Sequence, residues 1–156
     1  MIEPFDSEAG YRAAIDATLR AARREVRIFD SNLERMALDD PERSALLLNF
    51  LKRDSTRRLY MVLHNPEPLR TTHPRLLNLI RSNGHQIEIR QTPDHLRQLA
   101  DCFVLADELH GAIRFHADHA RGKAVGDDSI EIHAYWHRFD DLWEESQACT
   151  PSAAGY

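Results

Sequence analysis

Residues 58–64 read Arg-Leu-Tyr-Met-Val-Leu-His (RLYMVLH), a run that is apolar at nearly every position. A strand with such a run is buried on both faces, as in a parallel sheet that helices cover on each side. Upstream, residues 26–29 predict a shorter strand. Downstream, residues 85–91 (HQIEIRQ) place Ile87 and Ile89 on one face, which is typical of a half-exposed strand near a sheet edge.

Helical patterns separate and follow these strands. Ser7 is a suitable N-cap for a helix over residues 7–24, where apolar residues recur at helical spacing. Asp40 and the proline after it predict a second helix start. The last helix is expected to begin at Asp128, because Glu131 stands three residues later and completes a capping box.

The order of these elements predicts the fold class. Strands alternate with helices through residue 91, which favours right-handed crossovers and a mainly parallel sheet. Residues 102–107 and 112–116 form a hairpin pattern that makes the sheet mixed. We therefore expect a single α/β domain, a three-layer sandwich, over residues 1–148, with residues 149–156 as a flexible tail.

Composition limits the functions to consider. With 156 residues, 42% hydrophobic and 29% charged, the chain has the profile of one globular domain, and its net charge of −5 disfavours nonspecific nucleic-acid binding. It has no apolar run of about 20 residues for a membrane helix. Residues 1–7 are acidic rather than basic, unlike a signal peptide. Two isolated cysteines, Cys102 and Cys149, fit a reducing compartment, so we expect a cytoplasmic location and no cofactor.

Three segments carry a resemblance to a known fold: residues 25–33 (EVRIFDSNL), 58–65 (RLYMVLHN) and 86–92 (QIEIRQT). Their order, with helices between them, resembles the phospholipase D-like fold over about residues 7–116. In that family this register precedes a strand with the motif His-x-Lys-x-x-x-x-Asp. The matching segment here is residues 100–107 (ADCFVLAD), of which Asp107 alone agrees with the motif.

The residues at the two other motif positions cannot perform the chemistry of the motif. Ala100 stands where the resemblance places the histidine, and Cys102 replaces the lysine. The chain has two lysines, Lys52 and Lys123, and neither follows a histidine by two residues. The covalent phosphohistidine mechanism needs that histidine as nucleophile and the lysine to hold phosphate charge. The resemblance therefore implies a fold without its catalytic pair.

The chain also resembles a more closely related, uncharacterised bacterial domain family. The likeness rests on RIFDxxL, LADCFVLAD, RFHADHARGK and the C-terminal WxRFDxLWE. Such domains are similar to the C-terminal part of some GNAT-type acetyltransferase chains, so an acetyltransferase domain is one partner that the resemblance implies. A homodimer is another, because single phospholipase D-like units resemble half of a two-lobed protein.

The densest polar run follows a predicted strand and is the main candidate for a binding site. Its six candidate residues are Arg114, His116, Asp118, His119, Arg121 and Lys123. The arginines and the lysine suit a phosphate or carboxylate, whereas the histidines and the aspartate suit a metal ion. The third interpretation is a strand-end loop whose charges pair with one another and with the last helix.

Two smaller groups are secondary candidates. Asp30 and His64 follow neighbouring parallel strands, so they are expected at one sheet edge, where they could form a carboxylate–imidazole pair or simply cap turns. His133 and His137 lie four residues apart on the last helix, and we interpret them as a solvated pair.

The function that these observations favour is a catalytically inactive phospholipase D-like domain that binds a ligand or a protein partner in a regulatory role. An anionic small molecule carrying phosphate or carboxylate is the favoured ligand class. Two alternatives stay open: a phosphodiesterase or phosphatase rebuilt around His116, His119 or His64, and a metal-binding module.

Overall fold

The apolar run at residues 58–64 forms an interior strand. In the computed structural model, which describes residues 1–151, β3 (Arg58–Leu63) lies between β2 (Glu25–Asp30) and β4 (Ile87–Gln91) and is parallel to both. Its odd and even residues enter opposite cores, which explains why the whole run is apolar. β4 lies next to the sheet edge, covered only by the two-residue strand β8 (Gln147–Ala148).

The remaining strands extend the sheet beyond β2. They are β5 (Cys102–Ala106), β6 (His110–His116), β7 (His119–Val125) and β1 (Ile2–Phe5). The strand order is β1-β7-β6-β5-β2-β3-β4-β8. Every neighbouring pair in the described part is antiparallel except β2–β3 and β3–β4.

The mixed sheet is confirmed, but the expectation of a mainly parallel one is corrected. Three strands that the sequence patterns did not predict, β1, β7 and β8, each add an antiparallel neighbour. The parallel part is confined to the three strands joined by helical crossovers.

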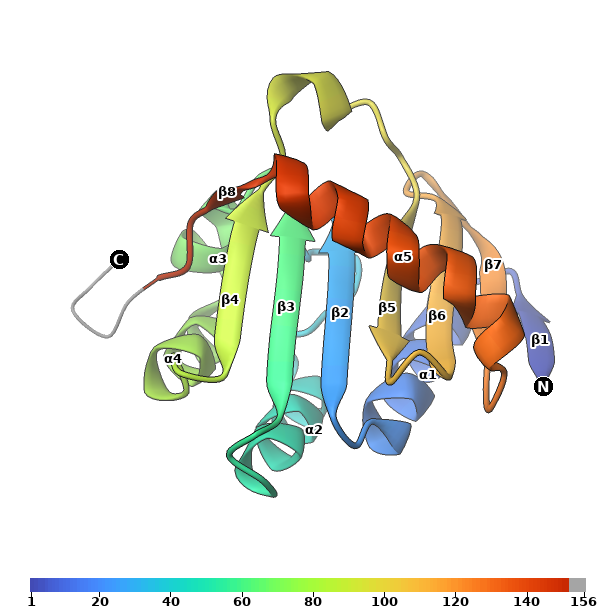
Figure 1. The fold of residues 1–156 in the computed structure, drawn as a ribbon, viewed down its shortest axis with the longest axis horizontal. Helices are drawn as coiled ribbons and strands as arrows, with labels where there is room; N and C mark the ends of the chain where they lie inside the picture. Colours follow the sequence, from blue (N-terminus) through green and yellow to red (C-terminus); the bar gives the residue numbers. More distant parts are fainter. Residues whose placement is uncertain (152–156) are drawn as a thin grey trace.

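Helices cover both faces of the sheet, as the three-layer prediction requires (Figure 1). The helices on one face are α1 (Glu8–Ala21), α2 (Pro41–Lys52), α3 (Glu67–Thr71) and α4 (Pro74–Ser82). The long helix α5 (Ser129–Glu145) crosses the other face, and a short 3₁₀ turn, Asp94–Leu96, stands above the sheet edge. No helix within residues 1–151 is long and apolar enough to cross a bilayer.

The three predicted helix starts are correct, but only two of them have a capping bond, because the Asp40 side chain makes none. The Ser7 hydroxyl accepts the N–H of Gly10 at 2.9 Å, and the Asp128 carboxylate accepts the N–H of Glu131 at 3.0 Å. Each bond satisfies one backbone donor that a helix leaves unpaired in its first turn. The capping box predicted at Asp128 is half formed, since the Asp128 N–H donates to the Leu109 carbonyl and not to Glu131.

The C-terminal boundary differs slightly from the predicted one. The N–H of Cys149 donates to the Ile89 carbonyl at 2.9 Å, and the Thr150 hydroxyl accepts the Ile89 N–H at 2.7 Å. Pairing to β4 thus continues two residues past residue 148. Most of the predicted tail, residues 152–156, lies outside the described residues.

Candidate functional site

The polar run is a β-hairpin rather than a loop that follows a strand. β6 and β7 pair through it, with an irregular register between Arg114 and His116. Since side chains alternate between the two faces of a strand, the run is divided between α1 and α5. The six predicted residues therefore do not form one cluster.

Arg114 points to the α1 face and is almost fully buried, with 1% of its side chain exposed. Its guanidinium donates to both carboxylate oxygens of Glu8, at 2.7 and 3.0 Å, and to the carbonyl of Ala117 at 2.8 Å. The hydrogen bond from Arg114 is the main cause that lowers the pKa of Glu8, and the same bond raises the pKa of Arg114. This residue holds the hairpin to α1 and is not available to a ligand.

Lys123 lies on the opposite face and is also occupied. Its ammonium forms an ion pair with Glu131 on α5 and lies 5.2 Å from the centre of the Tyr135 ring. Burial acts to lower the pKa of Lys123, but the bonds to Glu131 and Tyr135 outweigh it and raise the pKa. For Lys123, the third interpretation given above, in which the charges of this run pair with the last helix, is therefore correct.

Four of the six residues are exposed near the end of the hairpin, and three of them lie together: His116, His119 and Arg121. With Phe115, which is 55% exposed, they line a hollow of about 320 Å³. The two imidazole rings lie 5.4 Å apart, and within residues 1–151 the Arg121 guanidinium has neither a hydrogen bond nor an ion pair. The side chains of Arg121 and His119 and the Nε2 atom of His116 have no hydrogen-bond or ion-pair partner within the described residues and can contact a ligand.

Asp118, the sixth residue, has protein partners at the turn. Its carboxylate accepts from Arg35 at 3.2 Å, and its backbone N–H donates to Nδ1 of His116 at 3.1 Å. The Asp118 carboxylate also makes the net charge around the end of the hairpin less positive than the arginines and histidines alone would make it.

Asp30 and His64 do lie together at the carboxyl ends of β2 and β3, as predicted from their positions at the ends of these parallel strands. Both line a small cavity of about 170 Å³. Ala100, Cys102 and the hairpin residue Ala117 line the same cavity. The cavity thus contains the two positions that the resemblance assigns to the lost histidine and lysine.

The predicted carboxylate–imidazole pair is not formed, because both groups have other partners. The ring of His64 bonds the Thr92 hydroxyl through Nδ1 at 2.7 Å and the Leu99 carbonyl through Nε2 at 2.8 Å. The Asp30 carboxylate accepts the N–H of Leu33 at 2.7 Å. Burial raises the pKa of Asp30, and the backbone bonds partly oppose that effect. Asp30 therefore caps the turn that follows β2, whereas His64 links the end of β3 to the segment that follows β4.

Cys102 completes this buried polar group. The Tyr11 hydroxyl lies 3.6 Å from its sulfur, and burial, followed by the nearby Asp30 carboxylate, raises the pKa of the thiol to about 12. A thiol with that pKa is neutral at physiological pH and is neither a nucleophile nor a phosphate-binding cation.

Asp107, the one residue that agrees with the motif, lies at the opposite end of β5 from Cys102. Its carboxylate accepts three backbone N–H groups, from Arg23, Arg24 and Glu25, at 2.7 to 2.9 Å. It also has a left-handed backbone, with φ of 59°. It is a turn former.

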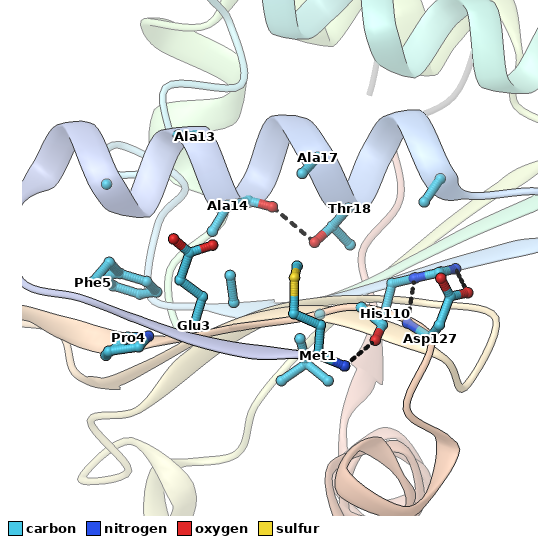
Figure 2. Close-up of a pocket in the computed structure, with 16 residues that line it drawn as sticks. Met1, Glu3, Pro4, Phe5, Ala13, Ala14, Ala17, Thr18, His110 and Asp127 are labelled. Atoms are coloured by element: carbon cyan, nitrogen blue, oxygen red, sulfur yellow. Dashed lines mark hydrogen bonds and ion pairs between the residues drawn. The ribbon is translucent and has the colours of Figure 1, made fainter.

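The sequence patterns did not indicate a groove between α1 and the strands β1, β6 and β7. It has a volume of about 430 Å³, and Figure 2 shows Met1 and Glu3 projecting from β1 toward α1. The wall formed by α1 consists of small residues, Ala13, Ala14 and Ala17 among them. Such residues give no sequence pattern that would predict a groove. The groove is mostly apolar, with His110 and Asp127 among its lining residues, 3.8 Å apart.

Comparison with known protein families finds one match. The sequence profile of the family described as a domain of unknown function (DUF7931) matches residues 7–152, nearly the whole chain. Among curated proteins, none is similar enough in sequence to match.

Solved structures confirm the resemblance of fold. Nuc, a phospholipase D family member from Salmonella typhimurium, superposes with a TM-score of 0.69 at 14% identity, over 96% of this chain and 97% of Nuc. NucT from Helicobacter pylori gives 0.59 at 10% identity, over 96% and 99%. TrmBL2, an archaeal chromatin protein, gives 0.69 at 12% identity over 95% of this chain, which spans about half (54%) of TrmBL2. At such identities the likeness establishes the fold alone.

Proposed function

We propose that this chain, which belongs to the DUF7931 family of domains of unknown function, is a non-catalytic phospholipase D-like domain that binds an anionic ligand or partner. The fold is that of phospholipase D family members. The absence of catalysis and the anionic ligand are inferences from the side chains described above.

The observation that carries the proposal is the composition of the strand-edge cavity. The motif positions there hold Ala100, which has no reactive atom, and Cys102, whose thiol has a pKa of about 12. His64, the nearest imidazole in the cavity, has both ring nitrogens occupied. The motif positions therefore supply neither the nucleophile nor the cation that a phosphoryl intermediate needs. Among the described residues, the one cation that lines the cavity, Arg97, is half-exposed and forms an ion pair with Asp94 at 3.1 Å.

The hairpin hollow supports the choice of ligand class. Arg121 has a free planar guanidinium, which suits the paired oxygens of phosphate or carboxylate. His116 and His119 add imidazole donors beside it, and Phe115 offers an exposed apolar surface. DNA binding, which is described for TrmBL2, is not part of the proposal because the net charge here is −5.

The rival function is a phosphodiesterase or phosphatase rebuilt on the hairpin histidines. The 5.4 Å separation of the His116 and His119 rings is the one feature that favours it. A chromogenic phosphodiester, bis(p-nitrophenyl) phosphate, tests it with and without Mg²⁺ or Zn²⁺. We expect no turnover above buffer. Turnover that His116→Ala abolishes would establish the rival.

Anion binding is tested separately by titration with inorganic pyrophosphate, followed by amide chemical shifts. We expect weak binding, with Kd on the order of 1 mM, and shifts centred on the hairpin. Replacing Arg121 with Gln should weaken binding about tenfold, since a charge-assisted bond is lost. Arg20→Gln, on the exposed side of α1, is the matched control. Equal binding by the Arg121 and Arg20 variants would refute the site.

The proposal includes a homodimer, because the chain corresponds to one complete phospholipase D-like unit such as Nuc. The sheet edges do not provide the interface. Glu3 and Pro4 lie on the edge strand β1, where charge and proline oppose strand addition, and β8 has only two residues. Light scattering during size-exclusion chromatography should give twice the chain mass of 18.0 kDa. A single species at the monomer mass would remove this part of the proposal.

A further inference from the structure

We propose that Glu108, His133 and His137 form a binding site for a divalent transition-metal ion of the Zn²⁺ type. Within residues 1–151 they are the one set of at least three histidine, cysteine or acidic side chains whose ligand atoms all lie within 4.8 Å of one another. The site lies between the β5–β6 turn and the exposed side of α5, and it shares no residue with the hairpin hollow.

The two imidazoles come from successive turns of one helix. Residues four apart on a helix share a face, and here the ring centres of His133 and His137 lie 4.3 Å apart. Both are accessible to an ion from solvent, with side chains 66% and 55% exposed. Helical histidine pairs with this spacing supply two ligands in known zinc sites.

The carboxylate comes from a turn that holds it in place. Asp107 and Glu108 both have left-handed backbones, with φ of 59° and 55°, which costs non-glycine residues free energy. The three backbone N–H bonds to the Asp107 carboxylate stabilise this conformation. As a result, Glu108 Oε1 lies 3.0 Å from His133 Nδ1 and 3.5 Å from His137 Nε2.

These separations match the edges of a zinc coordination shell. Zinc–nitrogen and zinc–oxygen bonds of about 2.0–2.1 Å place two tetrahedral ligands about 3.4 Å apart. Two imidazoles and one carboxylate are also a ligand set that zinc uses in proteins, with the fourth position left to water or to another ligand. Hard cations such as Mg²⁺ prefer oxygen ligands and fit this set less well.

One ligand also has the supporting contact that metal-binding histidines usually have. His137 directs Nε2 at Glu108, while its Nδ1 lies 3.6 Å from the Asp140 carboxylate. Asp140 is held in turn by Arg27, at 3.0 Å. A carboxylate behind the ring favours a proton on Nδ1 and leaves Nε2 to coordinate the ion. Asp140 is therefore a positioning residue for the site.

The test is calorimetric titration of the chelator-treated, dialysed protein with ZnCl₂ at pH 7.5. We expect one site per chain. Replacing His133 or His137 with Ala, or Glu108 with Gln, should weaken binding by about 100-fold or more, and Asp140→Asn by about tenfold. The matched control is the double variant His116→Ala/His119→Ala, which removes the hairpin histidines and should bind as tightly as the original chain. Because this titration contains no phosphate or carboxylate ligand, its outcome is independent of anion binding at the hairpin.

A second readout reports the ligands directly. Co²⁺ in place of zinc should show the intense visible absorption of a four-coordinate ion, and the His133→Ala variant should lose it. Far-ultraviolet circular dichroism checks that each variant is folded. Zinc binding that persists at full strength in folded His133→Ala and His137→Ala variants, or that is lost only in the hairpin variant, would overturn the proposal.

Discussion

The guanidinium of Arg114 lies in the interior with only 1% of its side chain exposed. A charge can be buried at acceptable cost only if it is paired and hydrogen-bonded. Glu8 and two backbone carbonyls, those of His116 and Ala117, meet this need, and the Tyr11 ring lies beneath at 5.0 Å. In sequence this arginine resembles its neighbour Arg121, yet the one is structural and the other is free.

Replacing Glu8 with Gln tests this assignment through its dependence on pH. The pKa of Glu8 is lowered in the folded protein, so its contribution to stability is present above the ordinary pKa near 4.5 and is lost as pH falls through the folded value. Glu8 is 47% exposed, so solvent screening reduces its effect, and we expect a loss of about 1–2 kcal/mol at pH 7. Urea unfolding should show the difference disappearing in acid.

Glu144→Gln, an exposed acid on α5, is the control for the net charge and should match the original chain at both pH values. A Glu8 variant whose deficit is equally large at pH 7 and in acid would show that the ion pair is not its cause.

Cys102 supports a second prediction at this scale, because its thiol is buried and has a pKa of about 12. In a Cys149→Ser variant, a disulfide reagent such as DTNB at pH 8 should label the remaining thiol only as fast as the protein unfolds. Urea should expose it at once. Rapid labelling in native buffer would mean that the strand-edge cavity admits reagents and that Cys102 is reactive.

At the scale of elements, the strongly patterned segments were predictable. β3 was evident from its continuous apolar run, and the starts of α1 and α5 from their capping residues. β7 was not, because the side chains it turns toward α1 are Ala120, Gly122 and Ala124, too small to produce an apolar period. The candidate site was misjudged for the same reason. Without β7, the six polar residues looked like one loop rather than two faces of a hairpin.

Gly122 shows why β7 must be small on this face. A Cβ atom there would lie 1.8 Å from the Ile113 carbonyl oxygen and 2.6 Å from the Phe5 ring. The backbone cannot yield as a flexible side chain would, so Gly122→Ala should destabilise the protein by about 2–3 kcal/mol. Urea unfolding measures the loss.

Gly84→Ala is the matched control for this substitution. A Cβ at Gly84 would make only ordinary contacts, 3.7 Å from the Ile80 carbonyl oxygen, so we expect a change within about 0.5 kcal/mol. If both alanine variants were equally stable, β6 and β7 would not approach as closely as the structure shows.

At the scale of the whole molecule, one sheet separates two hydrophobic cores, and its strands contribute side chains to both. Ile28 and Phe29, adjacent in β2, enter opposite clusters, as do Met61 and Val62 in β3. The first cluster packs under α1, α2 and α4, and the second under α5. Because neither core can be lost without exposing the other side of the same strands, the two should unfold together.

Leu47→Ala tests this coupling, since Leu47 is fully buried on α2, on the far side of the sheet from both tryptophans. We expect a loss of about 2–4 kcal/mol from the cavity that forms. Tryptophan fluorescence, which reports Trp136 and Trp143 on α5, should shift its urea midpoint as far as circular dichroism does. Ile130→Ala, at an 89% exposed position, should shift neither. If fluorescence kept its original midpoint while circular dichroism moved, the two faces would be separate cooperative units, and a ligand bound on one face could not be expected to stabilise the other.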